Sequence, residues 1–186
     1  MPPRNKKKKR SPILEWIAAI LVAVVLAASI RIFIFEPYVV DGDSMDPTLR
    51  NSEKLFVNKI IRYVGDFERG DIVIINGQNN SEHYVKRIIG LPGDTVEVKD
   101  DVLYVNGEEV KEPYLTSNRI EAESTGVQLT NDFKEVKVPE NKYFVMGDNR
   151  LVSMDSRTGL GLIETERVIG RSEFVMLPFD KVRATN

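Results

Sequence analysis

The sequence predicts a mostly β protein, in which antiparallel sheets form a partly open barrel after one N-terminal transmembrane helix. Two observations lead to this fold class. Residues 13–30 form an almost uncharged apolar run, and the chain after Pro37 consists of short β-type runs separated by turn residues. No long amphipathic helical pattern competes with these runs, so we expect strands joined by turns rather than alternating strands and helices.

The apolar run is long enough to cross a bilayer. Its 18 residues carry one charge, Glu15, and as a helix they would extend roughly 27 Å at about 1.5 Å per residue. Arg31 is followed by IFIF, so the tract reaches residue 35 if Arg31 extends to the headgroups. A cleaved signal peptide is the alternative. The tract exceeds the usual ~7–15 apolar residues of such peptides, which favours an uncleaved anchor over 13–35.

Charge is distributed unevenly along the chain. Residues 1–12 hold six basic side chains and no acidic one, whereas the remainder has a net charge of -8 although the whole chain is at -2. The positive-inside rule predicts a cytoplasmic tail over 1–12 and an extracytoplasmic domain over 36–186. An acidic domain argues against nucleic acid as a partner. KKKKR could also be a localisation or nucleic-acid patch, but its place beside the apolar run favours a topological signal.

The predicted strands alternate with recognisable turns. LPGD at 91–94 fits a type II turn, and Asn106-Gly107 is a strong hairpin signal. Residues 112–132 are polar and weakly patterned, which indicates an insertion or a long loop. Strands are expected at 54–58, 71–75, 84–89, 95–98, 102–105, 133–138, 142–146 and 167–177.

The composition limits the possible chemistry. The chain has no Cys, which excludes disulfides, thiolate catalysis and zinc–thiolate sites. A serine nucleophile in DSMDPTL (43–49) would therefore need an activating base from elsewhere. A Ser-His-Asp triad depends on His83, the one histidine, and a lone histidine entering a strand is usually a surface residue.

Lys86 is the alternative base. In the strand around it, Tyr84, Lys86 and Ile88 share one face, whereas His83, Val85 and Arg87 share the other. An exposed lysine on a half-buried strand is the ordinary interpretation. If the Tyr84–Ile88 face is buried instead, loss of water lowers the lysine pKa, and a neutral amine can take a proton from a serine.

Four segments occur in order: DSMDPTL (43–49), RGDIVI (69–74), YVKRIIGLPGD (84–94) and MGDNRLVSMDSRTGLGLI (146–163). Together they resemble the boxes of bacterial type I signal peptidases, especially the Gram-positive kind with a single N-terminal anchor. The resemblance implies that Ser44 is the nucleophile and Lys86 the general base, with no metal and no cofactor.

The same resemblance assigns supporting roles. It implies that Ser153 hydrogen bonds to the lysine and orients it, and that Asp155 and Arg157 form an ion pair that buttresses the site. Met45 is expected to pack near the nucleophile, and Pro47 to fix φ in its turn.

Some relatives have a serine two positions before the nucleophile as an oxyanion donor. Here that residue is Gly42, which leaves the Ser44 amide as the expected donor. Gly147, Asp148 and Asn149 are expected to support a turn.

The implied activity is that of a membrane-bound serine endopeptidase that cleaves signal peptides from exported preproteins. Its implied partners are these preproteins, the lipid bilayer and, by proximity, the secretion translocase. Two other classes remain open from the sequence: a catalytically silent membrane-tethered β module, and a self-cleaving Ser-Lys regulator. The relatives in that last class are soluble, which the apolar N-terminus counts against.

Overall fold

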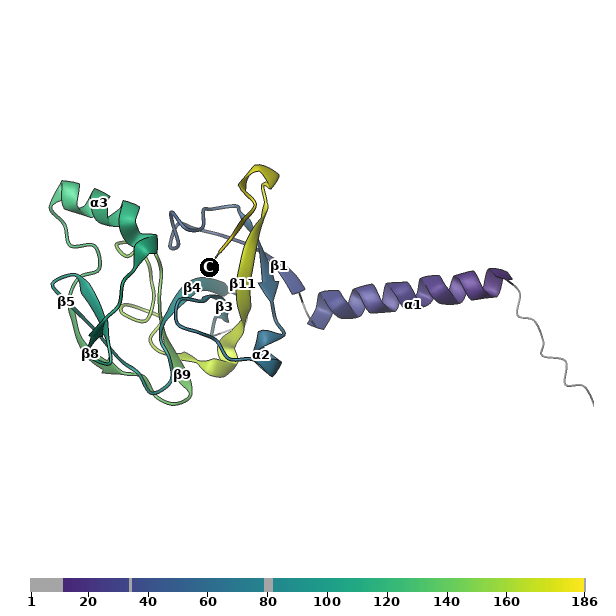
Figure 1. Ribbon diagram of the computed structural model, residues 1–186, viewed down its shortest axis with the longest axis horizontal. Helices are drawn as coiled ribbons and strands as arrows, with labels where there is room; N and C mark the ends of the chain where they lie inside the picture. The colour runs from purple at the N-terminus through teal and green to yellow at the C-terminus, as the bar shows by residue number, and fades with distance from the viewer. Residues whose placement is uncertain (1–11, 34, 79–81, 186) are drawn as a thin grey trace, which may run out of the picture.

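The computed structural model describes residues 12–33, 35–78 and 82–185, without the side chains of residues 29–33 and 35. A β-rich body begins at β1, and helix α1 (Pro12–Phe33) extends away from it (Figure 1). The predicted basic tail falls almost entirely in residues 1–11, which lie outside the described residues, as does residue 34 of the predicted anchor.

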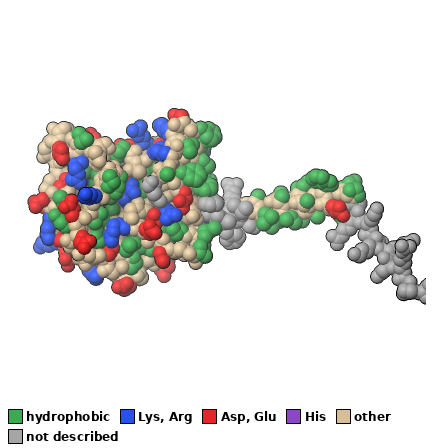
Figure 2. Space-filling model, in the orientation of Figure 1, with side chains coloured by type: hydrophobic (Ala, Val, Ile, Leu, Met, Phe, Trp, Pro, Cys, Tyr) green, Lys and Arg blue, Asp and Glu red, His purple; other side chains and the backbone are tan. Residues whose placement is uncertain are grey.

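Helix α1 exposes its apolar side chains along the part whose side chains are described. Trp16 is 72 % exposed and Leu21 63 % exposed, and Figure 2 shows this helix largely covered by hydrophobic side chains. Among the described residues, none of the helices combines the length and the apolarity needed for a membrane crossing.

The larger sheet has eight strands in the order β1-β2-β11-β3-β4-β9-β10, with β12 paired to β11. Each of its pairings is antiparallel. The strands are β1 (Phe35–Val39), β2 (Lys54–Asn58), β3 (Ile72–Asn76), β4 (His83–Gly90), β9 (Lys142–Met146), β10 (Ile163–Glu164), β11 (Val168–Leu177) and β12 (Arg183–Ala184).

The smaller sheet has the order β7-β6-β5-β8. Its strands are β5 (Thr95–Lys99), β6 (Val102–Val105), β7 (Glu108–Glu109) and β8 (Phe133–Lys137). Both predicted turns are present. Gly93 has φ 85° and the Asp94 amide donates to the Leu91 carbonyl, whereas Asn106 and Gly107 both have positive φ between β6 and β7.

The two sheets meet where β4 passes into β5. Gly90, at the end of β4, lies so close to Val96, Val138 and Phe144 that a Cβ atom there would be 2.6 Å from the Val96 side chain. The buried cluster at this junction joins β5 and β6 to Phe144 and Met146 of β9. A second buried cluster, under β2, β3 and β11, includes Met45 and Leu49 from the DSMDPTL segment.

The sequence prediction of a mostly antiparallel β protein is confirmed, and the predicted strands are found with their ends shifted by at most about one residue. Residues 112–132, expected to be an insertion or a long loop, have regular structure. This segment contains the 3-10 turn η1 (Pro113–Leu115) and helix α3 (Thr116–Thr125), which Gly126 ends in the left-handed conformation. Leu115, Ala122 and Leu129 form a small buried cluster that stabilises this helix, whose exposed surface is polar apart from Ile120.

Three further short helical elements complete the chain: α2 (Ile61–Val64), η2 (Thr165–Arg167) and η3 (Phe179–Lys181).

Candidate active site

Ser44 lies in a tight turn between β1 and β2. The Leu49 amide donates to the Met45 carbonyl at 2.9 Å, and the Asp46 amide donates to the Asp43 carbonyl at 3.1 Å. Met45 and Leu49 are buried in the core. These two apolar side chains therefore attach the turn to the core, and the hydroxyl of Ser44 lies at the surface of the turn.

Gly42 and Pro47 lie on either side of the nucleophile. Gly42 has φ +91°, a backbone conformation that side chains disfavour, and its amide donates to Asn51 Oδ1 at 3.0 Å. The peptide bond between Asp46 and Pro47 is cis. The Gly42 amide is thus directed to Asn51, and the amide of Ser44 remains the expected oxyanion donor.

Lys86 reaches Ser44 from the middle of β4. Its Nζ lies 2.7 Å from Ser44 Oγ and 3.0 Å from the Val85 carbonyl oxygen, to which it donates. The residue is 3 % exposed. Burial lowers the Lys86 pKa to about 8, although the negative charges of Asp155 and Asp148 act in the opposite direction. Near pH 8 a substantial fraction of this amine is therefore neutral.

The only histidine has a different environment. His83 is exposed, and its ring packs edge-on against Tyr38 with the ring centroids 5.3 Å apart. The hydroxyl of Ser44 is hydrogen bonded to Lys86 instead. The geometry therefore favours a Ser-Lys pair over the Ser-His-Asp triad.

A small cavity of about 80 Å³ opens beside the two side chains. It lies between the segment from β1 to the Ser44 turn and the first half of β4. Besides the reactive pair, its lining combines mostly apolar residues with Asp41, His83 and Tyr84. The others are Tyr38, Val39, Val40, Met45, Ile74 and Val85. A group bound there would lie next to Ser44 Oγ, largely shielded from water.

The loop after β9, residues 147–158, closes the site from the other side. The Asn149 amide donates to the Ser44 carbonyl at 3.0 Å, which ties this loop directly to the nucleophile turn. Asp155 and Arg157 form the predicted ion pair in bidentate form, at 2.9 and 2.8 Å. Burial alone would raise the Asp155 pKa, but hydrogen bonds from Arg157, its charge and the Gly147 amide hold that pKa below its ordinary value.

The predicted hydrogen bond between Ser153 and Lys86 is not formed. Among the described residues Ser153 Oγ is buried without a hydrogen-bond partner. The Lys86 amine is directed to Ser44 Oγ and the Val85 carbonyl instead. Ser153 does lie beside the site, because a Cβ atom on Gly147 would overlap both Ser153 Oγ and the Ser44 carbonyl oxygen.

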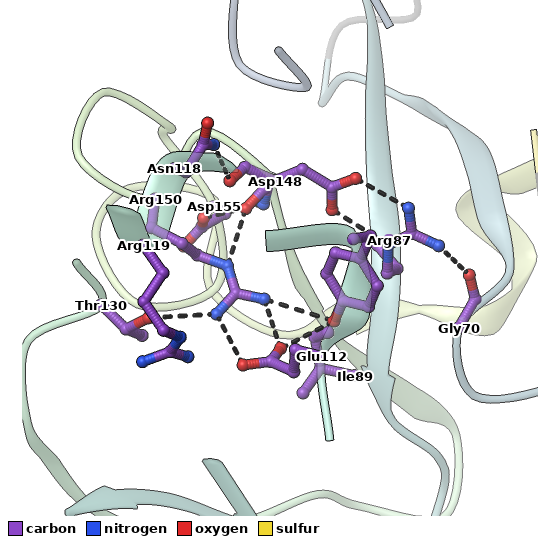
Figure 3. A network of polar contacts seen from close by, with 12 residues as sticks. Gly70, Arg87, Ile89, Glu112, Asn118, Arg119, Thr130, Asp148, Arg150 and Asp155 are labelled. Carbon is purple, nitrogen blue, oxygen red and sulfur yellow. Dashed lines mark hydrogen bonds and ion pairs between the residues drawn. The ribbon is translucent and has the colours of Figure 1, made fainter. Parts of the chain in front are cut away.

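Two buried ion pairs were not predicted from the sequence (Figure 3). Arg87 forms a bidentate pair with Asp148 at 2.9 and 2.7 Å, and Arg150 pairs with Glu112 at 2.5 Å. The side chains of these four residues are at most 6 % exposed. The position of Arg87 within an apolar strand was a signal that its side chain is buried. Its partner Asp148 could not be predicted from the sequence.

The similarity of this chain to known proteins agrees with this arrangement. Residues 13–177 match the model of the family described as signal peptidase, peptidase S26. The chain belongs to this family.

Two relatives illustrate the similarity. The chain is 61 % identical to a signal peptidase I of Bacillus licheniformis over the full length of both proteins, and 60 % identical to signal peptidase I T of Bacillus subtilis (strain 168), covering 98 % of this chain and 94 % of the relative. A crystal structure of a signal peptidase I from Enterococcus faecalis V583 matches with a TM-score of 0.53 at 38 % identity, covering 58 % of this chain and 97 % of that one. The family and these relatives are signal peptidases. The chain is therefore a serine endopeptidase.

Gly147 provides a direct test of how tightly the loop must approach the nucleophile. We expect Gly147→Ala to lower peptidase activity by about a hundredfold, because the added methyl group displaces Ser44 or Ser153 and small misplacements of reacting groups are costly. The measurement is the rate of cleavage of a peptide substrate at saturating concentration.

Gly159→Ala, one residue after this loop, is the matched control. Its Cβ atom would meet the side chain of Met154 at 2.8 Å, and that flexible, half-exposed side chain can move aside. The control should keep at least half of the original rate. Equal rates for the two variants would contradict the close-approach argument.

Proposed function

We propose that the chain is a membrane-bound endopeptidase that removes N-terminal signal peptides from exported preproteins, with Ser44 as nucleophile and Lys86 as general base. The observation that carries the proposal is the 2.7 Å contact between Lys86 Nζ and Ser44 Oγ in a site that keeps the amine away from water. The class of substrate comes from the relatives, which are signal peptidases.

The reaction follows from the chemistry of this pair. Neutral Lys86 takes the proton of Ser44 as Oγ attacks the scissile carbonyl carbon, and the resulting oxyanion accepts a hydrogen bond from the Ser44 amide. The tetrahedral intermediate breaks its C–N bond, and the protonated Lys86 gives its proton to the leaving amine. Lys86 then takes a proton from water as the water oxygen attacks the acyl carbon. The second tetrahedral intermediate breaks its bond to Ser44 Oγ, and Lys86 returns the proton to this oxygen, which releases the new carboxyl end and restores Ser44 and the neutral amine.

The supporting residues hold this geometry. Asp155 and Arg157 fix the 147–158 loop, and Asn149 connects the loop to the nucleophile turn. Ser153 is a candidate to orient the protonated amine, because its buried hydroxyl has no competing partner in the described structure. The carboxylates of Asp148 and Asp155 stabilise the ammonium form that appears during each step.

The cavity and the strand edges support recognition of an extended peptide. β1 is the terminal strand of the larger sheet, and the pairing of β4 with β9 begins only at Arg87. Two strand edges beside the cavity are therefore open for an added strand. A cavity of about 80 Å³ has room for small side chains but not for aromatic ones, which fits cleavage after small residues.

We propose that the tract over 13–35 anchors the enzyme in the bilayer, with the 1–12 tail in the cytoplasm and residues 36–186 outside the membrane. Helix α1 has 22 residues, which corresponds to roughly 33 Å. It points away from the β-rich body and carries exposed apolar side chains (Figures 1 and 2). Confining enzyme and preprotein to one surface, near the secretion translocase, raises their effective concentration.

The identity of the reactive pair is tested with a labelled preprotein. We expect the purified protein to cleave it after a small residue, and we expect Ser44→Ala and Lys86→Met each to lower the rate by at least about a thousandfold, since either change removes the acyl-transfer chemistry. Lys99→Met, at an exposed lysine of the smaller sheet, is the matched control and should retain most of the rate.

Each alternative predicts a different outcome. A catalytically silent β module leaves the preprotein intact in all samples. A self-cleaving regulator cuts its own chain but not the preprotein. Full activity of the Lys86→Met variant would rule out Lys86 as the base.

The pH dependence tests the protonation state of Lys86. A base must be neutral to accept a proton, so kcat should rise with pH through a midpoint near 8, well below the ordinary lysine pKa of about 10.4. The measurement is kcat from pH 6 to 10, with far-UV circular dichroism confirming the fold at each pH. A rate that does not change across this range would contradict a titrating amine.

Membrane anchoring is tested by flotation with lipid vesicles. The double variant Leu21→Asp/Val24→Asp should lose most of its vesicle association, because each central charge costs about 2.5–3.5 kcal/mol on insertion. Leu21→Ile/Val24→Leu is the control and should float like the original protein. Equal flotation of both variants would show that α1 does not insert, and unchanged cleavage in detergent would show that the site is intact.

A further inference from the structure

Residues 112–132, for which the sequence suggested no role, contact the two segments that form the active site. They connect β7 of the smaller sheet to β8 and carry η1 and α3. In Figure 1, α3 lies at one end of the β-rich body, above β5 and β8. Three side chains of this segment, Glu112, Tyr114 and Asn118, reach the residues around Ser44 and Lys86.

Glu112 holds the 147–158 loop through Arg150. Both side chains are at most 3 % exposed, and Arg150 also donates to the Gly147 carbonyl at 2.9 Å and to Thr130 Oγ1 at 3.2 Å (Figure 3). One guanidinium therefore joins the start of the loop to both ends of the 112–132 segment. A buried, fully hydrogen-bonded ion pair of this kind holds the loop and the segment in one arrangement. Separation of the two side chains would leave a buried charge without a partner, which is energetically costly.

Tyr114 packs against the residue that follows the proposed base. The Arg87 guanidinium carbon lies 3.9 Å from the centre of the Tyr114 ring, and the same guanidinium forms the bidentate pair with Asp148. The ring covers one face of the ion pair and limits its access to water. The segment is therefore packed against β4 as well as against the loop after β9.

Asn118 makes the most informative contact. Its side-chain Nδ2 donates to the carbonyl of Asp46 and to the carbonyl of Asp148, both at 3.0 Å. Asp46 belongs to the turn that presents Ser44. Asp148 precedes Asn149, whose amide donates to the Ser44 carbonyl. One amide group of α3 thus bridges the nucleophile turn and the loop that closes on it (the Asp148 side of this bridge is visible in Figure 3).

An asparagine suits this position for a chemical reason. The Nδ2 amide carries two hydrogens, and here both point to backbone carbonyls of different segments. Aspartate has the same shape but no donor, so its carboxylate would face two carbonyl oxygens. The contact therefore depends on the amide group and not on side-chain volume.

We infer that Asn118 is a positioning residue for the reaction: by bridging Asp46 and Asp148 it fixes the distance between Ser44 and the loop that shields Lys86. The inference rests on the proposed function of Ser44 and Lys86. Asn118 does not line the cavity beside Ser44, so it acts on the reaction through these two backbone segments and not through the substrate.

Two kinetic consequences follow. Loosening the bridge misplaces Ser44 relative to Lys86, which lowers kcat, whereas KM changes little because the cavity is intact. Water also gains access to the amine, which raises the Lys86 pKa. The charged groups around this amine are Asp155 and Asp148, each paired with an arginine, Arg157 and Arg87 respectively. None of these is altered by the substitution.

The experiment compares Asn118→Ala and Asn118→Asp with Ser117→Ala, an exposed position on the same helix. For Asn118→Ala we expect kcat to fall between about tenfold and a hundredfold, with KM within about twofold of the original value. The pH midpoint of kcat should move upward from near 8. Asn118→Asp should be impaired at least as strongly, and Ser117→Ala should behave like the original enzyme.

Several results would overturn the inference. An Asn118→Asp variant with the original kcat would show that the donated hydrogen bonds are unimportant. A loss of kcat without any shift of the pH midpoint would indicate only a loss of folded protein, since the midpoint does not depend on the folded fraction. If the original protein fails to cleave the preprotein, the proposed function fails. If it cleaves and the Asn118 variants cleave equally well, the positioning role alone is wrong.

Discussion

A lysine amine can serve as a base near neutral pH only if its pKa is lowered, and removal of water from around the ammonium form lowers it. The structure meets this condition at Lys86, whose side chain is buried in the middle of β4 while its tip contacts Ser44. Much of the surrounding structure keeps the Lys86 amine buried beside Ser44. The core under β2, β3 and β11 holds Met45 and Leu49 below the nucleophile turn, and the 147–158 loop covers the turn from the other side.

The pKa of the Lys86 amine also depends on the charged side chains around it. The carboxylates of Asp155 and Asp148 favour the ammonium form and therefore raise the Lys86 pKa, although each is held in a bidentate pair, with Arg157 and Arg87 respectively. Burial outweighs these two charges, so the Lys86 pKa falls to about 8. The buried ion pairs are thus best understood as electrostatic and geometric supports for the dyad.

The sequence predicted the local elements well and the long-range contacts only in part. Alternation and turn residues located the strands and the 106–107 hairpin, because these signals are local. The resemblance to type I signal peptidases also brought Ser44, Lys86, Asp155 and Arg157 into one hypothesis. The structure places these residues near one another, and their catalytic roles stay predictions. Helix α3 was missed because its stability comes from three buried side chains and not from an amphipathic pattern. The Ser153 hydrogen bond was predicted wrongly, and the partners of Arg87 and Arg150, which lie 61 and 38 residues away along the chain, had no local signal at all.

The link between the Ser44 carbonyl and the Asn149 amide also has a consequence for biosynthesis. The turn bearing the hydroxyl is made early, yet its last backbone partner is more than one hundred positions downstream. A nascent polypeptide therefore leaves the ribosome with the serine already formed but without the peptide groups that hold it in place. The geometry of the proposed site therefore arises only after the 147–158 loop has been synthesised and has folded onto the turn.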